Sequence, residues 1–540
     1  MKIYTPYLFA LFIVFCASPI YGQPNGTRTP KDWHLRDPES DHVPGVSVER
    51  AYEDLLKGEP SRKVLVAVID TGIDINHEDL QGIIWTNPNE IPDNGIDDDH
   101  NGYIDDVHGW NFIGGKNGNV TDDTGEITRE YMRLKSIFDS IPEAHVRRKQ
   151  KADYERYQRI RKTFEKALAD NQREYQAYRS LYRNLHESVD TLKKVLQTSH
   201  LSVAAIDSFK TDVPALLFAK GYTLRFWRRM GEETEVDSIL REIKVAVDYY
   251  RVVVEYNYNP DFDSRLIVGD DRNNLHERYY GNNDVIGPDP EHGTHVAGII
   301  AANRNNNLGI KGIADQVTIL PIRAVPPNGD ERDKDVANAI RYAVDNGATI
   351  INMSFGKSYS PGKQVVDEAV RYAEQKGVLL VHAAGNDGQN VDEKIDYPSR
   401  YYLSGKEAGN WLEVAASGKD ENSFVASFTN YGKKTVDLFA PGVDVYSSVP
   451  GNKYKNESGT SMASPVAAGI AALLKSYFPD LSVAEIREIL VNSSRKMDGL
   501  RVNRPGGGKT ELSALSRSGG LINAYEAVRL ARQRPSRKIQ

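Results

Sequence analysis

The chain has 540 residues and a formal net charge of −7, and 40% of its residues are hydrophobic. This length allows two or more domains, and the hydrophobic content is sufficient for a packed core. The acidic balance gives no electrostatic reason for nucleic-acid binding, so we expect no nucleic-acid partner. After the first 22 residues, we expect no membrane span, because no apolar run approaches the required length.

Residues 1–22 are typical of a secretory signal peptide, with an apolar stretch at residues 7–15 and a polar break at residues 19–23. Cys16 is the only cysteine, so the mature chain would contain no disulfide. Lipid attachment at Cys16 is the competing interpretation, although the bulky Phe15 stands where lipoprotein signals prefer a small residue. We predict a secreted or periplasmic protein.

A buried strand that ends in an acidic residue is predicted before residue 72. Apolar residues run from Val64 to Ile69, and Asp70 and Gly72 follow. Such a run is typical of a parallel strand that ends in a turn. Asp70 is a candidate functional residue, because open α/β sheets place their chemistry at the carboxyl ends of strands. A helix is predicted upstream, over residues 46–56.

Oxygen-bearing side chains alternate along residues 97–105, around a glycine that allows a sharp turn. The first nine positions of an EF-hand-like calcium loop are matched by Asp97, Asp99, Asn101, the carbonyl of Tyr103, and Asp105. The twelfth position is His108 instead of a bidentate Glu, so we predict a calcium site of another local form. An acidic surface turn without a metal is the alternative.

Residues 119–283 differ in composition from the rest of the chain. Tyr, Arg, Glu and Leu dominate, and no glycine occurs between Gly125 and Gly221. Apolar residues recur at steps of three and four from Tyr154 to Val195, which predicts a long amphipathic helix. A second helical stretch is predicted near residues 236–256. The two apolar faces would bury each other as a hairpin or small bundle.

His292 and Ser461 each lie near the start of a predicted helix. Gly293 allows a close backbone approach, and the apolar residues 296–302 continue a helix that packs on the sheet. Ser461 opens a helix that continues through Leu473, so its amide and the positive helix end face whatever the hydroxyl attacks.

Asp70, His292 and Ser461 fit the roles of an acid, a base and a nucleophile. A serine hydroxyl needs an imidazole to accept its proton and a carboxylate to fix the imidazole's tautomer. Each residue alone would be an ordinary turn or cap residue, but the three together favour catalysis. The chain order Asp, His, Ser is that of subtilisin. The three segments resemble those of the subtilisin-like peptidases, the subtilases.

The resemblance implies a second donor for the oxyanion of a tetrahedral intermediate, beside the amide of Ser461. Asn386 closes the segment AlaAlaGlyAsn, which matches the subtilase motif that carries the oxyanion asparagine. A structural asparagine in a turn at the end of a strand is the alternative.

The resemblance also implies a substrate-binding strand at residues 350–356, which walls the pocket for the residue before the cut bond. Backbone partners for the substrate would come from Ser354, Phe355 and Gly356. Asp396 precedes a TyrPro pair, and in subtilases the residue at this place lines the pocket bottom. A buried carboxylate there would favour Arg or Lys in the substrate, whereas an outward, solvated Asp would not.

Subtilases often hold a further calcium between an Asp that follows the catalytic Asp and a loop after the His helix. Asp79 and the asparagine-rich residues 303–307 lie in those places, although the loop differs in length from the common pattern. We expect either calcium to stabilise the fold, because hard oxygen ligands hold loops and the reaction needs no metal-bound water.

Two features depart from the subtilase pattern. The interval between Asp70 and His292 is several times the usual one, and the stretch before the first strand leaves no room for a folded inhibitory pro-domain. The insertion would emerge near the active-site face. It would therefore gate substrate entry, bind a protein partner, or replace the pro-domain in guiding folding.

We predict an α/β fold with a mostly parallel central sheet flanked by helices and a large helical insertion between the Asp and His segments. The function predicted is that of a secreted serine endopeptidase acting on proteins or peptides through an acyl-enzyme. The alternatives are a catalytically silent scaffold that binds a partner through the insertion, and peptide ligation by the same acyl-enzyme. The predicted organisation is a signal peptide (1–22), a first catalytic part (23–118), the insertion (119–283), a second catalytic part (284–530) and a basic tail (531–540).

Overall fold

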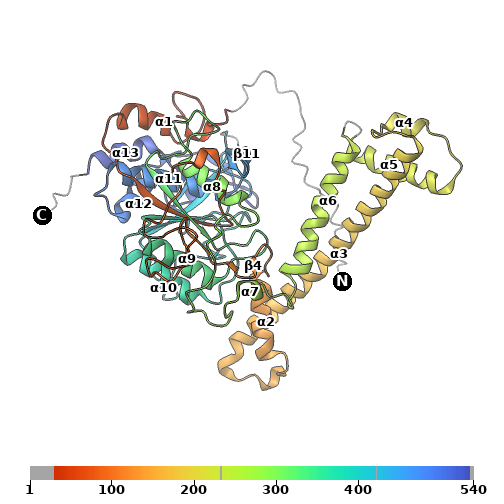
Figure 1. Ribbon diagram of the computed structural model, residues 1–540, viewed down its shortest axis with the longest axis horizontal. Helices are drawn as coiled ribbons and strands as arrows, with labels where there is room; N and C mark the ends of the chain where they lie inside the picture. The colour runs from red at the N-terminus through yellow and green to blue at the C-terminus, as the bar shows by residue number, and fades with distance from the viewer. Residues whose placement is uncertain (1–29, 232–233, 421–422, 535–540) are drawn as a thin grey trace.

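The computed structural model describes residues 30–231, 234–420 and 423–534 (Figure 1). The predicted signal peptide, including Cys16, lies outside the described residues, and so does the end of the basic tail. Within the described ranges, each helix is too short or too polar to cross a lipid bilayer.

A nine-stranded sheet forms the centre of the catalytic part, in the order β12-β15-β9-β8-β7-β6-β1-β5-β2 (Figure 1). Neighbouring strands are parallel except for β12 and β15, so the predicted fold class is confirmed. The strands are β1 Val64–Asp70, β2 Trp110–Asn111, β5 Val317–Arg323, β6 Ile350–Met353, β7 Leu379–Ala383, β8 Trp411–Ser417, β9 Leu438–Pro441, β12 Arg495–Lys496 and β15 Gly520–Leu521. Three two-stranded ribbons lie outside this sheet: β3 Gly114–Gly115 with β4 Gly118–Asn119, β10 Val445–Val449 with β11 Lys453–Glu457, and β13 Arg501–Asn503 with β14 Lys509–Glu511.

Helices cover both faces of the sheet, so successive residues of a strand enter different apolar clusters. Val66 and Val68 of β1 pack with α8, α11, α12 and α13 on one face, whereas Ala67 and Ile69 pack with α9 and α10 on the other. This double burial explains why β1 is a continuous apolar run. These helices are α8 Glu291–Ala301, α9 Asp333–Asp345, α10 Lys363–Gln375, α11 Thr460–Tyr477, α12 Val483–Asn492 and α13 Ala524–Arg532.

Short helical segments precede the first strand. After the 3₁₀ turn Trp33–Leu35, helix α1 spans Val48–Arg50 and continues as a π-helical turn over Ala51–Leu56. The helix predicted for residues 46–56 therefore begins two residues later than expected. Trp33 and Leu35 join the apolar cluster that also contains α8 and α11.

A helical arm projects from the catalytic part between β4 and α8 (Figure 1). Its helices are α2 Glu126–Phe138, α3 Lys151–Val195, α4 Val203–Ser208, α5 Pro214–Met230, α6 Val236–Val252 and α7 Arg265–Val268, and a π-helical turn at Val253–Asn257 follows α6. α3 has 45 residues, which corresponds to a length of about 68 Å at 1.5 Å per residue. Both helical stretches predicted from the apolar periodicity are present, and α5 and α6 pack against the far part of α3.

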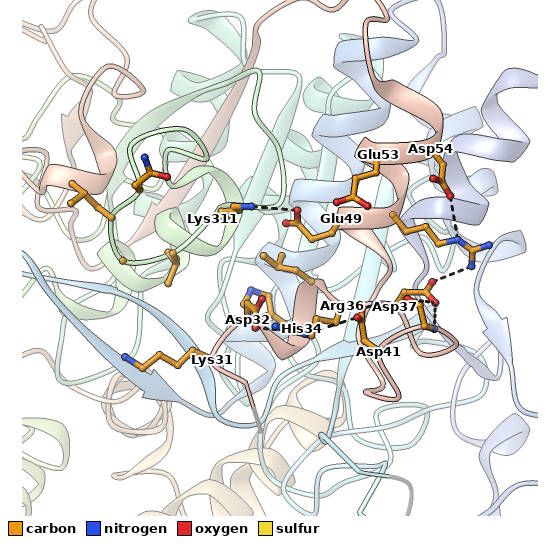
Figure 2. A pocket seen from close by; sticks show the side chains of 17 residues that line it. Lys31, Asp32, His34, Arg36, Asp37, Asp41, Glu49, Glu53, Asp54 and Lys311 are labelled. Carbon is orange, nitrogen blue, oxygen red and sulfur yellow. Dashed lines mark hydrogen bonds and ion pairs between the residues drawn. The ribbon is translucent and has the colours of Figure 1, made fainter. Parts of the chain in front are cut away.

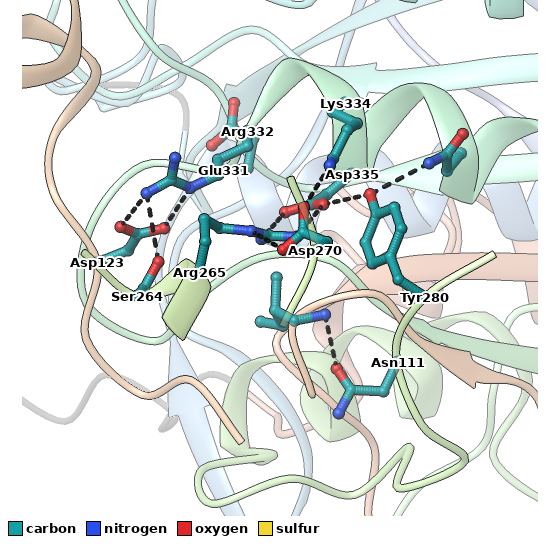
Figure 3. A network of polar contacts seen from close by, with 12 residues as sticks. Asn111, Asp123, Ser264, Arg265, Asp270, Tyr280, Glu331, Arg332, Lys334 and Asp335 are labelled. Atoms are coloured by element: carbon teal, nitrogen blue, oxygen red, sulfur yellow. Dashed lines mark hydrogen bonds and ion pairs between the residues drawn. The ribbon is translucent and has the colours of Figure 1, made fainter. Parts of the chain in front are cut away.

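The two ends of the arm meet at its base. The Thr128 hydroxyl donates to the Asn257 carbonyl at 2.6 Å, and the Asn257 side chain donates to the Asp123 carbonyl at 2.8 Å. Arg332 of the catalytic part forms two hydrogen bonds with the Asp123 carboxylate, both at 2.8 Å (Figure 3). The outgoing and returning chains are therefore tied to each other and to the loop before α9.

A second buried ion pair fixes the chain where it returns from the arm. Arg265 of α7 binds Asp335 of α9 at 2.8 and 3.1 Å and Asp270 at 2.5 Å (Figure 3). The Tyr280 hydroxyl donates to the same Asp335 carboxylate at 2.6 Å. These side chains are almost fully buried. The arm is thus joined to the sheet domain by directional, charge-assisted contacts.

Candidate active site

Asp70 and His292 meet at the carboxyl edge of the sheet. Asp70 is the last residue of β1, and its Oδ1 lies 2.7 Å from Nδ1 of His292, in the first turn of α8. The close approach depends on Gly293, since a methyl group there would lie 2.1 Å from the Gly72 carbonyl oxygen. The structure therefore brings together the acid and the base predicted from the sequence.

The hydrogen bond to Asp70 decides which nitrogen of His292 is free. Nδ1–H donates to the carboxylate, so Nε2 remains available to accept a proton from a nucleophile. Burial alone would lower the pKa of His292, but the charge of Asp70 and the hydrogen bond to it together raise that pKa. The imidazole is thus a stronger base than an isolated histidine.

Ser461 is the second residue of α11, at the positive end of the helix. Its hydroxyl donates to the Ser354 carbonyl at 3.1 Å rather than to His292. In return, the Ser354 hydroxyl donates to the Ser461 carbonyl at 3.0 Å and accepts from the Asn352 side chain at 2.9 Å. Asn352 also accepts a hydrogen bond from Ser464 at 2.8 Å. The end of β6 and the start of α11 are therefore locked together, in part through Asn352 and Ser464, which no sequence motif had marked as functional.

The amide nitrogen of Asn386 and the backbone nitrogen of Ser461 lie near one another, and both residues line one cavity. The Asn386 Oδ1 accepts from the Thr460 amide at 2.9 Å and from the Thr460 hydroxyl at 3.0 Å, which fixes the orientation of the side chain. A methyl group on Gly459 would lie 3.6 Å from the Ser461 nitrogen and 3.7 Å from Asn386 Nδ2. Two hydrogen-bond donors thus lie close to one point beside Gly459, and a pair of donors is what an oxyanion hole needs.

A cavity of about 570 Å³ opens beside these donors. Its lining includes Ser461, Asn386 and the predicted substrate edge at Ser354, Phe355 and Gly356. The edge residue Lys357 pairs in antiparallel fashion with Tyr397, through two backbone hydrogen bonds at 2.8 and 2.9 Å. Three residues of the arm, Ile127, Thr163 and Tyr258, line the same cavity.

Asp396 lies inside this cavity, where the sequence resemblance placed it. A methyl group on Gly356 would lie 2.7 Å from Asp396 Oδ2, and one on Gly385 would lie 2.6 Å from it. The two glycines therefore make room for the carboxylate between the two edges of the cavity. Burial raises the pKa of Asp396 to about 7, despite the nearby charge of His382.

Comparison with known sequences agrees with this geometry. The Subtilase family matches residues 61–508, which is most of the chain. The chain belongs to the subtilase family. Thermitase from Thermoactinomyces vulgaris is 38% identical over 237 residues, which cover 44% of this chain and 74% of thermitase.

Other similar proteins are matched over a smaller share of their length. The thermophilic serine proteinase of Bacillus sp. strain AK1 is 40% identical over 248 residues, covering 46% of this chain and 55% of that protein. The thermostable alkaline protease of Halalkalibacterium halodurans is 41% identical over 197 residues, covering 36% and 50%. This subtilase therefore spans about half the length of these two relatives.

Among solved structures, the protease domain of PatA, solved as a point mutant, is 28% identical. The match covers 46% of this chain and 82% of that chain, with a TM-score of 0.37.

A buried histidine lies beneath the substrate edge of this subtilase. His382 of β7 faces two acceptors, the Glu413 carboxylate at Nδ1 and the Phe355 carbonyl at Nε2, both at 2.9 Å. Trp411 donates to the other oxygen of Glu413 at 2.6 Å. Burial alone would lower the pKa of His382, but the charge of Glu413 and the hydrogen bond to it raise that pKa, which favours a ring that donates to the Phe355 carbonyl. Its one signal in the sequence is its place at the end of the apolar run at residues 378–382.

Three carboxylates gather at the predicted calcium loop of this subtilase, and one of them, Asp99, belongs to the predicted ligands. Within the described ranges, one group of three candidate metal-ligating side chains has its ligand atoms within 4.8 Å of one another, namely Glu90, Asp99 and Asp106. Asp97 instead accepts from the Asn101 and Gly102 amides. These two hydrogen bonds to Asp97 close the turn of the loop.

The remaining predicted ligands also have other contacts. Asp105 turns to the Asn94 and Gly95 amides, at 3.2 and 2.9 Å. The Asn101 side chain donates to Asp99 and Asp106, and Tyr103 packs its ring against Trp110. Glu90 Oε2 is buried without a partner. An oxygen-rich site with one unsatisfied carboxylate oxygen fits a hard cation such as calcium.

Asp79 lies against the loop that the subtilase resemblance assigned to it. Its Oδ1 accepts from the Asn306 side chain at 2.6 Å, and its Oδ2 accepts from the Ile310 amide at 3.1 Å. The Asn303 amide donates to the Asp79 carbonyl at 2.9 Å. The structure therefore brings Asp79 and this loop together.

A larger cavity, of about 790 Å³, lies away from the chemistry (Figure 2). It separates the segment around His34 and Asp37 from α1 and the loop that contains Lys311. His34 is buried, and burial lowers its pKa to about 4, so its ring is neutral. None of Asp70, His292 and Ser461 lines this cavity, so we do not assign the substrate to it.

Proposed function

We propose that this protein is a serine endopeptidase that hydrolyses peptide bonds in proteins. The observation that carries this proposal is the Asp70–His292 hydrogen bond at the end of β1, next to the end of β6, where Ser354 is hydrogen-bonded to Ser461. An isolated acid or base has many structural roles, but an acid–base pair beside a serine and an asparagine that line one cavity provides the parts of acyl transfer. Family membership supports the same conclusion.

In the proposed reaction, the Ser461 oxygen attacks the substrate carbonyl carbon while His292 Nε2 takes the hydroxyl proton. The carbonyl oxygen becomes an oxyanion, which accepts hydrogen bonds from the Ser461 amide and Asn386 Nδ2. His292 then gives its proton to the amine as the C–N bond breaks, and an acyl-enzyme remains. Water attacks this ester by the reverse steps, with His292 as the base again.

Substrate binding would prepare the nucleophile. The Ser354 carbonyl accepts the Ser461 hydroxyl in the free protein. An extended peptide that pairs with the edge at residues 354–356 would offer its own N–H to this carbonyl. The Ser461 hydroxyl would then be free to turn to His292. Catalytic hydrogen bonds are often completed only in the substrate complex.

We also propose that Asp396 receives an Arg or Lys side chain before the cut bond. Its carboxylate lies in the cavity, and no side chain of the described residues pairs with it. A guanidinium or ammonium group would supply that partner and stabilise the ionised form. A pocket without this acid would favour apolar residues instead.

We propose structural calcium at two places, the group formed by Glu90, Asp99 and Asp106, and the loop held by Asp79. Calcium there would stabilise the fold, so its removal by a chelator should lower Tm. The variant Glu90→Gln should lose part of this calcium-dependent rise in Tm, whereas Asp93→Asn in the same loop should keep it. An equal response of all three proteins to calcium would contradict the assignment to Glu90.

Labelling with a fluorophosphonate tests the proposed function against a catalytically silent scaffold. Such a reagent reacts with an activated serine, so the wild-type protein should be labelled at Ser461 and the variant Ser461→Ala should not. Absence of labelling in folded wild-type protein would favour the silent scaffold. Mass spectrometry of the products separates hydrolysis from ligation, because ligation joins the acyl fragment to a second peptide.

We also propose that residues 119–283 form an insertion in the catalytic domain and that residues 1–22 are a signal peptide that directs secretion. Mass spectrometry of the mature N-terminus in the culture medium and in the cell fraction would test the secretion route. A lipid-modified Cys16 at the N-terminus would contradict cleavage after residue 22 and support lipoprotein anchoring.

A further inference from the structure

The base of the helical arm forms part of the cavity that holds the proposed nucleophile. Ile127 lies in the first turn of α2, Thr163 lies on α3, and Tyr258 follows the π-helical turn after α6. All three line the cavity that also contains Ser461 and Asn386. Figure 1 shows α2 and the near end of α3 beside the catalytic part.

The wall that the arm contributes is largely apolar and aromatic. Ile127 and Tyr258 are half-buried and pack with Tyr359 of the catalytic part around the cluster formed by α2 and α3. The Tyr258 ring also contacts Phe164, with ring centroids 5.8 Å apart. Across the cavity lies the substrate edge at Phe355. A volume of about 570 Å³ is in the range of sites that hold a ligand larger than one side chain.

Buried charges hold this wall against the substrate edge. Glu126, next to Ile127, accepts from Lys357 at 2.6 Å, and Lys357 follows the edge residue Gly356. Lys357 also binds Asp333 at 2.8 Å. The Lys357 and Glu126 side chains are 1% and 5% exposed, so water does not compete for this ion pair.

Two further side chains, those of Arg129 and Asp330, fix the start of α2. Arg129 binds Glu126 at 2.7 Å and donates to the carbonyls of Asp330 and Glu331, both at 3.0 Å. The Asp330 carboxylate accepts from the Glu126 amide at 2.7 Å and caps the helix. Burial opposes ionisation of Glu126, but Arg129 and Lys357 lower its pKa to about 2. A wall held in this way does not swing open as a lid would.

We propose that the base of the arm is a fixed wall of the substrate site, where Ile127 and Tyr258 select a bulky apolar side chain upstream of the cut bond. The inference rests on the proposed peptidase function. The residue received by Asp396 and the one received by Ile127 and Tyr258 are different parts of one extended peptide. The arm thereby acts on specificity, and the chemistry at Ser461 proceeds without it.

Cleavage of matched peptides by the variants Tyr258→Ala and Ile127→Ala tests this inference. One fluorogenic substrate carries a single blocked Arg, and a series of tetrapeptides carries either Phe or Gly at each upstream position. In the wild-type protein one upstream position should prefer Phe over Gly by about tenfold in kcat/KM. Both variants should lose this preference mainly through KM, by a factor larger than any change in kcat/KM for the single-residue substrate.

Two control variants distinguish the loss of the apolar wall from a general loss of folding. Tyr258→Phe keeps the ring and should keep the preference. Val245→Ala changes an α6 side chain that is 69% exposed and far from the cavity lining, so it should behave as wild type. Preferences that stay the same in Tyr258→Ala and Ile127→Ala would overturn the inference.

Labelling and binding distinguish the failure of this inference from the failure of the proposed function. If fluorophosphonate labels Ser461 but both variants keep the preference for Phe, the peptidase proposal is supported and the proposed role of Ile127 and Tyr258 in specificity is wrong. If Ser461 is not labelled, the function fails. Calorimetry with Ser461→Ala protein then still tests the wall, because the Phe peptide should bind about tenfold more tightly than the Gly peptide only while Tyr258 is present.

Discussion

The catalytic part and the arm of this protein are stabilised by different means. In the catalytic part, two large apolar clusters cover the sheet on both faces, and β1 is buried almost throughout. Along α3, by contrast, the buried residues lie mainly near its two ends, at Tyr157–Phe164 and at Tyr178–Leu192. Most of the remaining surface of this helix is exposed.

This difference in burial indicates how a long helical arm is held in position relative to the candidate active site. Apolar burial stabilises a core but is not directional, whereas charge-assisted hydrogen bonds fix distances and angles. The base of the arm combines a small aromatic cluster with buried ion pairs at Arg332, Arg265 and Lys357. We infer that these ion pairs contribute to the placement of the substrate wall more than to overall stability.

The largest expected effect is on catalysis, which depends on the catalytic part and not on the arm. Ser461→Ala removes the nucleophile, and activity should fall by about 10⁴- to 10⁶-fold. Tm should stay close to the wild-type value, since the hydroxyl makes one hydrogen bond, to the Ser354 carbonyl. Peptide cleavage and a thermal melt check both statements.

A serine on the arm is the matched control for this substitution. Ser180 of α3 is exposed, and Ser180→Ala should leave both activity and Tm unchanged. Substantial residual cleavage by Ser461→Ala protein would show that another group is the nucleophile.

Breaking an ion pair at the base of the arm is expected to be the next largest effect. Arg332→Ala leaves the Asp123 carboxylate, which is 1% exposed, without its bidentate partner. Loss of one partner of a buried pair costs about 3–5 kcal/mol. Amide hydrogen exchange should therefore accelerate in α2 and at residues 253–257.

Amide hydrogen exchange in the central sheet should not change in Arg332→Ala protein. The strands of the sheet are held by apolar contacts remote from Asp123, so β7 and β8 should keep wild-type protection. Arg241→Ala on the exposed face of α6 is the control and should change neither region. Uniform acceleration in sheet and arm would contradict the division into two differently stabilised regions.

A smaller effect concerns the pH dependence of substrate preference. The pKa of Asp396 is about 7 in the folded protein, raised by burial, so the carboxylate is mostly neutral below this pH and mostly ionised above it. The ratio of kcat/KM for Arg over Leu substrates should therefore rise by about tenfold between pH 6 and pH 8. Titration of His292 affects both substrates equally and cancels in the ratio.

The variant Asp396→Asn should make this ratio independent of pH. A neutral amide of similar shape keeps the pocket but removes the titrating charge. If the ratio still rises with pH in Asp396→Asn protein, another group recognises the basic side chain. An Arg preference that is absent at every pH would refute the proposed role of Asp396.

The sequence was sufficient for features that depend on short segments. The apolar run before Asp70 predicted a strand buried on both faces, and the apolar periodicity between Tyr154 and Val195 predicted α3 almost to its ends. Both signals are local, because strand and helix periodicities depend on neighbouring residues. The family resemblance at the TyrPro pair led us to expect Asp396 in the pocket, and Asp396 lines the cavity.

Features that depend on contacts between distant segments could not be predicted in the same way. The ion pair between Glu126 and Lys357 joins residues that are 231 positions apart, and no local pattern marks it. The group formed by Glu90 with Asp99 and Asp106 has the same origin, since Glu90 lies outside the loop at residues 97–105. The wall formed by Ile127 and Tyr258 follows from these long-range contacts.

The smallest expected effect is on the exposed surface of the arm, where ion pairs lie in water. Lys244 and Asp248 of α6 are paired one turn apart, and their side chains are 48% and 47% exposed. Such pairs contribute about 0.3–0.5 kcal/mol, so the double variant Lys244→Ala/Asp248→Ala should change Tm very little. Chemical unfolding at low and high salt measures the difference. A loss as large as that of Arg332→Ala would mean that exposed charges, rather than the buried base, hold the arm in place.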